Sequence, residues 1–256
     1  METRQDAAMK KAALRKKRKR RRRIFIFTFF LIVMLAVAAV CSLTFLFPIK
    51  SISASGSKLY TQQQIVSASG LIGKNLFTVS EEEVLSNIKH KLPYIDNLKL
   101  KRSFPDSVSL IVTDAKAYAS YSVGNKFYKV SKSGTVLEAE YELPENTFEV
   151  KANGVTCNIG DSVLFKDSST EKLVKNLISC LEKNKIKINS IDVTDKNDIK
   201  FRVDDRFDVI LGSKANYENK IAQLESMIKN IEETRKGTIN LSIWNENNRQ
   251  TSFIPE

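Results

Sequence analysis

The stretch IFIFTFFLIVMLAVAAVCSLTFLF, residues 24–47, contains no charged residue in twenty-four positions. As an α-helix rising about 1.5 Å per residue it would extend roughly 36 Å, enough to cross a hydrocarbon core of about 30 Å with some tilt. The sequence therefore predicts a single membrane-spanning helix, and this helix decides how the rest of the chain is arranged.

A run of nine basic residues directly precedes this stretch and sets its expected orientation. Lys and Arg beside a spanning helix bias that end to stay in the cytoplasm. No comparable run follows Phe47, so we expect residues 1–23 inside and everything from Pro48 onward outside. The residues expected to set this topology are Arg15, Lys16, Lys17, Arg18, Lys19, Arg20, Arg21, Arg22 and Arg23.

A cleaved signal peptide is the main alternative for a basic start followed by an apolar run. Ala36-Val37-Ala38 fits the small-x-small cleavage pattern, but the run continues to Phe47, beyond an ordinary signal core. Lipid attachment at Cys41, as in a lipoprotein, would require a small residue at the position that Val40 occupies. The length of the run favours a retained anchor.

Charge is distributed unevenly along the chain. The formal net charge is +12, of which residues 1–23 carry +10 and the remainder only +2. The basic tail is best explained by topology and by contact with anionic lipid head groups, with an unstructured nucleic-acid-binding arm as the alternative. The exported part shows no nucleic-acid footprint by net charge.

The chain offers few residues for catalysis or metal binding. His90 is the only histidine, and it lies between two lysines as a solvated surface residue would. Glu81-Glu82-Glu83 and Asp204-Asp205 are better explained as a helix start and a turn. Cys157 and Cys180 are predicted to be buried free thiols, although a disulfide between them stays open. We therefore expect no enzyme, no metal and no cofactor.

The first exported block, residues 48–114, predicts the order strand, helix, helix, strand, strand. A short strand ends at Gly56, and Thr61 with Gln64 fits a capping box for a helix that stops at Gly70. A second helix begins after Ser80 and ends before Pro93. Alternating apolar residues on either side of a Phe104–Ser107 turn then predict a hairpin. Such an order buries one face of a small sheet under two helices.

From residue 115 onward the pattern changes to short strands with two helices. Turns at Gly124-Asn125 and Lys132-Ser133-Gly134 predict a meander, and Asn153-Gly154 predicts a further hairpin turn. The predicted elements that follow are a helix with a capping box at Ser168 and Glu171, a strand at 186–193, a hairpin turning at Asp204-Asp205, a helix from Lys214 to about Thr234, a strand through Ile239, Leu241 and Ile243, and a last short strand within Arg249–Ile254 that stops before Pro255.

Several phrases in this order resemble the FtsQ/DivIB family of bacterial cell-division proteins. The phrases are Ile49–Leu59 with its glycine, Gly73-Lys74-Asn75-Leu76-Phe77, Arg102-Ser103-Phe104-Pro105-Asp106-Ser107, Val130–Val136, and Phe207–Gly212 running into the late helix. The chain departs from the family's frequent Arg-Pro pair after Asp114, where it has Ala115-Lys116-Ala117. The resemblance covers nearly the whole exported part.

The resemblance implies a single-pass membrane protein with an α+β exported region. Its parts would be a cytoplasmic tail (1–23), a transmembrane helix (24–47), a POTRA-like βααββ domain (48–114), a β-rich domain with two helices (115–245) and a C-terminal edge strand and tail (246–256). The implied function is that of a divisome scaffold in the cell membrane, located at the septum, which links assembly to septal peptidoglycan synthesis.

The resemblance also implies which partners bind and where. Small bitopic proteins of the FtsB/DivIC and FtsL type would add a strand beside the last strand of the β-rich domain. The residues placed there are Arg249, Thr251, Ser252, Phe253 and Ile254. The alternative for Phe253 and Ile254 is that they only pack the tail onto the domain.

Two other functions are weighed against this one. A POTRA-type module for envelope protein secretion or assembly would ordinarily continue into repeated domains or a long barrel. A membrane-anchored cell-wall enzyme would need a catalytic constellation that the sequence lacks.

Overall fold

The computed structural model describes residues 23–37, 47–244 and 250–256. Residues 1–22, which carry eight of the nine predicted topology residues, lie outside the described residues. So do residues 38–46 of the predicted membrane span, and residues 245–249, which include Arg249.

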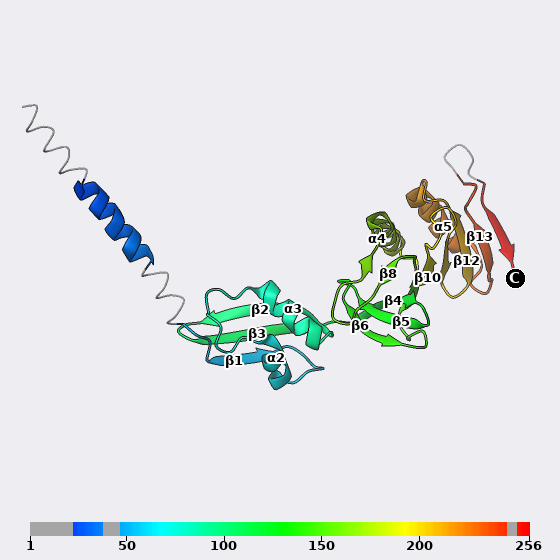
Figure 1. The fold of residues 1–256 in the computed structure, drawn as a ribbon. Helices are drawn as coiled ribbons and strands as arrows, with labels where there is room; N and C mark the ends of the chain where they lie inside the picture. Colours follow the sequence, from blue (N-terminus) through cyan, green and yellow to red (C-terminus); the bar gives the residue numbers. More distant parts are fainter. Residues whose placement is uncertain (1–22, 38–46, 245–249) are drawn as a thin grey trace, which may run out of the picture. The chain divides into compact units, whose positions relative to one another are not determined.

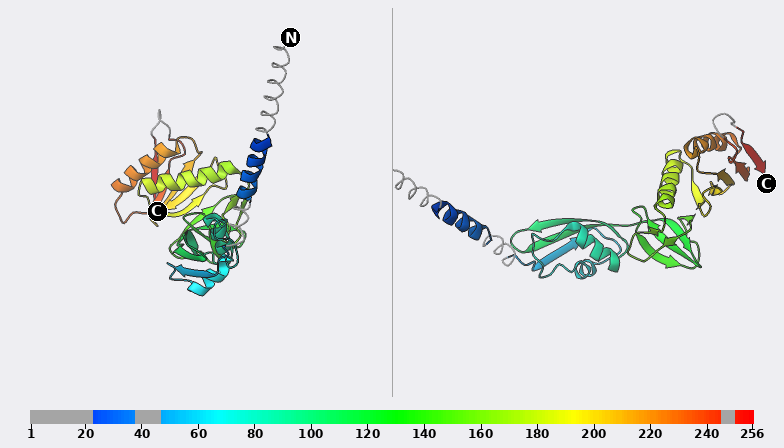
Figure 2. Two further views of the ribbon diagram at one scale, coloured as in Figure 1. Left: turned by 90° about the vertical axis from the view of Figure 1, so that its left-hand side faces the viewer. Right: turned by 45° about the horizontal axis from the view of Figure 1, so that its top comes forward.

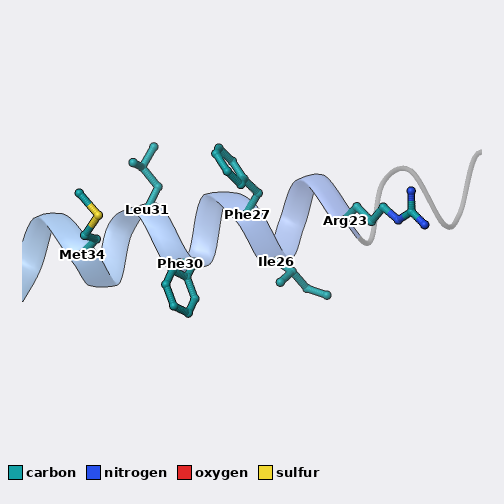
Figure 3. A pocket seen from close by; sticks show the side chains of 6 residues that line it. All are labelled: Arg23, Ile26, Phe27, Phe30, Leu31 and Met34. Atoms are coloured by element: carbon teal, nitrogen blue, oxygen red, sulfur yellow. The ribbon is translucent and has the colours of Figure 1, made fainter.

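Residues 23–37 form a helix with every side chain exposed (Figure 1). Figure 3 shows Phe27 and Leu31 projecting from one side of this helix and Ile26 and Phe30 from the other. Among the residues described, no helix combines the length and the apolar character needed to cross a bilayer. The predicted span of 24–47 extends into residues that the structure does not describe.

The next domain has the predicted βααββ order. Its elements are β1 (Ser51–Ser55), α2 (Gln62–Ser69), α3 (Glu81–Lys91), β2 (Ile95–Ser103) and β3 (Ser107–Asp114), with the sheet order β1-β3-β2. The predicted capping box is confirmed, since the Thr61 hydroxyl accepts from the Gln64 N–H and the Gln64 side chain accepts from the Thr61 N–H. Gly70 ends α2 in the left-handed conformation, as predicted.

The core of this domain comes from one face of each helix and alternate strand residues. Ile65, Val84 and Ile88 are buried on the helices. Leu98, Leu100, Leu110 and Val112 are buried at every second position of the predicted hairpin. This arrangement is the two-layer α+β domain expected from the sequence.

The chain from Ala117 onward forms a nine-stranded mixed sheet. Its strands are β4 (Ala117–Val123), β5 (Lys126–Ser131), β6 (Val136–Glu140), β7 (Phe148–Lys151), β10 (Ile188–Asp192), β11 (Ile199–Val203), β12 (Phe207–Gly212), β13 (Gly237–Asn240) and β14 (Ser252–Pro255). The spatial order is β14-β13-β12-β11-β10-β7-β4-β5-β6, so β14 and β6 are its two edges. A separate two-stranded ribbon pairs β8 (Val155–Thr156) with β9 (Leu164–Phe165).

Two helices, α4 (Ser168–Lys183) and α5 (Tyr217–Asn230), lie next to each other on one face of this sheet (Figure 2). Their buried side chains share one core with alternate residues of the strands, for example Val209 and Leu211 of β12. Lys220 of α5 is also buried, and its ammonium donates to the carbonyl oxygen of Leu211 at 2.8 Å. Loss of hydration lowers the pKa of Lys220, and the hydrogen bond ties α5 to the end of β12.

The predicted hairpin at Asn153-Gly154 is wrong. A turn is present, but β7 before it pairs in parallel with both β4 and β10, while β8 after it pairs with β9. Both sides of β7 are already occupied, so the chain must leave the large sheet after Ala152.

Four helix and strand limits also differ from the prediction. Asp167, and not Ser168, caps α4 by accepting from the Ser169 N–H. Helix α5 begins at Tyr217 and not at Lys214, because Asn216 has a φ of 55°, which a continuing right-handed helix does not allow. It ends at Asn230, because Ile231 is extended. Strand β13 ends at Asn240, short of Leu241 and Ile243.

Cys157 and Cys180 are free thiols in the structure, the first buried and the second half-buried. Burial raises the pKa of the Cys157 thiol to about 11, which keeps it protonated and unreactive at neutral pH.

Candidate interface at the edge of the nine-stranded sheet

Strand β14 is the last strand of the sheet and pairs on one side only. It runs antiparallel to β13, with Ile239 opposite Phe253 and Thr238 opposite Ile254. No other strand of the described residues pairs with its far side. A strand in this position presents backbone N–H and C=O groups that an extended segment from another chain can pair with.

The side chain of Phe253 fastens β14 to the domain. It is half-buried against the main core, and its ring lies 6.0 Å from the Phe207 ring in an edge-to-face arrangement. Phe207 belongs to β12, two strands away, and is fully buried. The aromatic contact therefore reaches across β13 and holds the edge strand in register.

Alternate residues of β14 point away from that core. Ser252 is exposed, and Ile254 has 61% of its surface exposed. Because side chains alternate along a strand, these two lie on the face opposite Phe253. The edge thus offers a small hydroxyl and an apolar side chain without a formal charge.

Gly237 at the start of β13 permits the close approach of β14. A Cβ atom on this glycine would lie 2.2 Å from the carbonyl oxygen of Ile254 and 2.9 Å from Cα of Pro255. Its φ of +154° is also one that L side chains rarely adopt. Only glycine fits here without displacing the last residues of the chain.

Arg206 holds the connection between α5 and β13. Its Nη1 donates to the carbonyl oxygens of Glu232 at 3.1 Å and Glu233 at 2.8 Å. Its guanidinium lies 4.6 Å from the centre of the Phe207 ring, and its carbonyl oxygen accepts from the Gly237 N–H at 3.1 Å. Arg206 is therefore a positioning residue for β13 and, through it, for β14.

The structure brings together three of the five predicted partner-binding residues in one strand. Ser252, Phe253 and Ile254 lie in β14, and Thr251 directly precedes it, half-buried. Arg249 is outside the described residues. Of the predicted topology residues, Arg23 alone is described, at the start of the helix 23–37.

No local sequence pattern predicts that Arg206, Phe207 or Gly237 contributes to this edge. A partial signal was present in Pro255, which belongs to β14 although the predicted strand stopped before it. Proline within a strand is confined to edges because it has no N–H to donate. Nothing local in the sequence, however, links residue 207 to residue 253.

In the part of the chain that the structure describes, no group of three or more His, Cys, Asp or Glu side chains is placed to hold a metal ion.

Two family models match consecutive parts of the chain. The POTRA domain of FtsQ type matches residues 47–114, and the C-terminal domain of cell division protein FtsQ/DivIB matches residues 119–242. The chain belongs to the FtsQ/DivIB family. These limits agree with the change of pattern that the sequence shows near residue 115, and β14 of this FtsQ/DivIB chain lies beyond the matched residues.

Relatives from several bacteria resemble this FtsQ/DivIB chain over most of its length. A cell division protein DivIB of Clostridium tetani is 25% identical over 81% of this chain and 82% of its own. A DivIB of Clostridium acetobutylicum is 27% identical over 71% and 74%. A cell division protein FtsQ of Koribacter versatilis is 24% identical over 63% of this chain and 47% of its own.

Proposed function

We propose that this FtsQ/DivIB protein is a non-enzymatic scaffold of the divisome, anchored in the cell membrane by one helix. It binds small bitopic division proteins of the FtsB/DivIC and FtsL type by strand addition to β14, and so connects divisome assembly to septal peptidoglycan synthesis. The observation that carries this proposal is the open side of β14, a neutral edge strand held firmly by its own domain.

Strand addition suits this edge for a physical reason. Backbone hydrogen bonds supply affinity, while the side chains of alternate residues select the partner sequence. Phe253 is engaged with Phe207, so Ser252 and Ile254 are the β14 side chains available to select a partner. Pre-ordering of β14 lowers the entropy lost on binding.

The membrane anchor is supported by the character of the helix 23–37. Its residues from Ile24 onward are apolar apart from Thr28, and they are exposed on all sides (Figure 3). A helix that is apolar all round belongs in an apolar environment. The Thr28 hydroxyl lies 3.0 Å from the carbonyl oxygens of both Ile24 and Phe25, so the one polar side chain is satisfied within the helix.

Site-directed photo-crosslinking in dividing cells tests the interface. A photoreactive amino acid at Ser252 should give adducts with the DivIC- and FtsL-type proteins. The same amino acid at Glu140, on the opposite edge strand β6, is the matched control and should give none. Absence of these adducts at residue 252, or equal yields at both positions, would overturn strand addition at β14.

Topology and location need a separate measurement. Protease added to intact spheroplasts should digest residues 48–256, and replacing Arg15–Arg23 by neutral residues should protect a fraction of them. A fluorescent fusion should gather at mid-cell, whereas a uniform envelope signal would favour a secretion or assembly module instead.

A further inference from the structure

Three phenylalanines from separate parts of the chain form an exposed cluster at the start of the POTRA domain. The Phe47 ring lies 5.3 Å from that of Phe77 and 5.0 Å from that of Phe104, measured between centroids. Phe77 is 51% exposed and Phe104 is 71% exposed. Exposed aromatic side chains that touch one another mark a surface for an apolar partner.

The backbone around the cluster is held by several hydrogen bonds. The Leu76 N–H donates to the carbonyl oxygen of Phe47 at 3.0 Å, and the Ile49 N–H donates to that of Lys74 at 2.9 Å. The guanidinium of Arg102 donates to the carbonyl oxygens of Leu76 at 2.9 Å and Val79 at 2.5 Å. Residues 47–52, 71–80 and 101–109 belong to one compact unit. The rings are therefore presented on an ordered base.

The position of Phe47 in the chain limits what the cluster can meet. Phe47 is the last residue of the apolar stretch 24–47, and about 20 of those residues suffice to cross the hydrocarbon core. About four residues then separate Phe47 from the hydrocarbon core, and an extended chain covers at most about 3.5 Å per residue. The cluster therefore lies within roughly 15 Å of the lipid. This step depends on the proposed membrane anchor.

The charge of the same segments suits an anionic lipid surface. Residues 47–52, 71–80 and 101–109 contain Lys50, Lys74, Lys101 and Arg102 but a single acid, Asp106. Basic residues beside aromatic ones are the composition that binds the head-group region of membranes. A polypeptide partner would not require this excess of positive charge.

We infer that the Phe47–Phe77–Phe104 cluster docks into the outer surface of the membrane in which the chain is anchored. Phe77 and Phe104 enter the boundary between head groups and acyl chains, while the net positive charge of the surrounding segments attracts the phosphates of anionic lipids. Docking would restrict how the POTRA domain tilts on its anchor.

The test uses the full-length chain in nanodiscs that contain phosphatidylglycerol. Phe104→Trp places a fluorophore in the cluster, and Tyr141→Trp, at a position 70% exposed in the β-rich domain, is the matched control. The emission of the unsubstituted chain, which comes from Trp244, is subtracted from that of each variant. With lipid that carries a nitroxide quencher at acyl carbon 5, emission from residue 104 should fall at least twofold and that from residue 141 should not change.

Three outcomes would overturn the inference. If residues 104 and 141 are quenched equally and carbonate does not extract the chain, the cluster does not dock into lipid but the membrane anchor is retained. If the tryptophan at residue 104 is shielded from quenching by acrylamide only after bitopic partners are added, the cluster binds a protein and not lipid. Extraction of the chain by carbonate removes the anchor and lipid docking together.

Discussion

The two edges of the nine-stranded sheet are built in opposite ways. At β6, the Val136 N–H donates to the carbonyl oxygen of Asp161 at 2.8 Å, and the Val136 carbonyl accepts from the Gly160 N–H at 2.9 Å. The loop that follows Asn158 therefore covers the start of this edge. Further along β6, Glu138 and Glu140 share the Lys129 ammonium at 2.6 Å each.

At β14, in contrast, the described residues place neither a loop nor an ion pair along the outer side of the strand. Charges and covering loops are ordinary protection against unwanted strand pairing. Within residues 47–244 and 250–256, one edge of the sheet has this protection and the other does not, although both belong to one domain. An uncovered edge is therefore a local property of β14 and not a general property of the sheet.

The largest effect is expected from Gly237→Ala, which should detach β14 and so remove the open edge of the sheet. The added Cβ overlaps the Ile254 carbonyl, so we expect a loss of about 2–3 kcal/mol of unfolding free energy and loss of partner binding. Urea unfolding and co-purification of bitopic partners measure both. Gly124→Ala is the control, because its Cβ meets nothing within 4 Å and adds only the cost of a positive φ, about 1 kcal/mol. Equal losses in the two variants would contradict the steric argument.

Phe253→Ala should loosen β14 without displacing it. Truncation of a fully buried phenylalanine to alanine costs about 3–5 kcal/mol of unfolding free energy. Phe253 is half-buried, so its truncation should cost about 2 kcal/mol. Hydrogen exchange should show faster exchange in β13 and β14 and no change in β5 and β6. Tyr141→Ala, on an exposed loop, should change stability by less than about 0.5 kcal/mol. Unchanged exchange at β14 would show that Phe253 does not hold it.

Ile254→Lys should make the β14 edge more like the charged β6 edge by placing a charge on it. Both Ile254 (61% exposed) and Ile159 (50% exposed) are surface residues, so lysine at either should alter stability by less than about 0.5 kcal/mol. Partner affinity should fall about tenfold for Ile254→Lys and stay constant for Ile159→Lys beside the β6 edge. Isothermal titration with a bitopic partner measures this, and a similar fall in both variants would disprove an interface specific to β14.

The smallest effect is expected from Glu138→Gln at the protected edge. The Lys129 ammonium lowers the pKa of Glu138, so the carboxylate adds stability above about pH 4.3 that is lost as the pH falls through the lowered pKa. The Glu138 side chain is 40% exposed, and solvent screening limits the gain to about 0.5 kcal/mol. Urea unfolding should show this difference at pH 7, and the difference should shrink as the pH falls below about 4.3. A difference that is as large at pH 3 as at pH 7 would assign it to packing. The variant should bind no partner at β6, since Val136 stays covered.

Local patterns predicted most elements of both domains. The Thr61 capping box, the alternation through Leu98 and Val112, and the apolar stripe of α4 are each decided by residues close in sequence. Such patterns depend on the helical and strand periods alone. The prediction was wrong at Asn153-Gly154 because a good turn sequence does not say whether the strands on its two sides are free to pair.

The amino-acid sequence by itself determined the apolar stretch, the basic tail, the two domains and the last strand with its residues Ser252, Phe253 and Ile254. The pairing of β14 with β13, the contact of Phe253 with Phe207 across β13, and the covering of one sheet edge but not the other among the described residues could be seen only in the folded chain. The physical reason is that side-chain alternation tells which face of a strand is buried. Which neighbours a strand has depends on contacts between residues far apart in the chain.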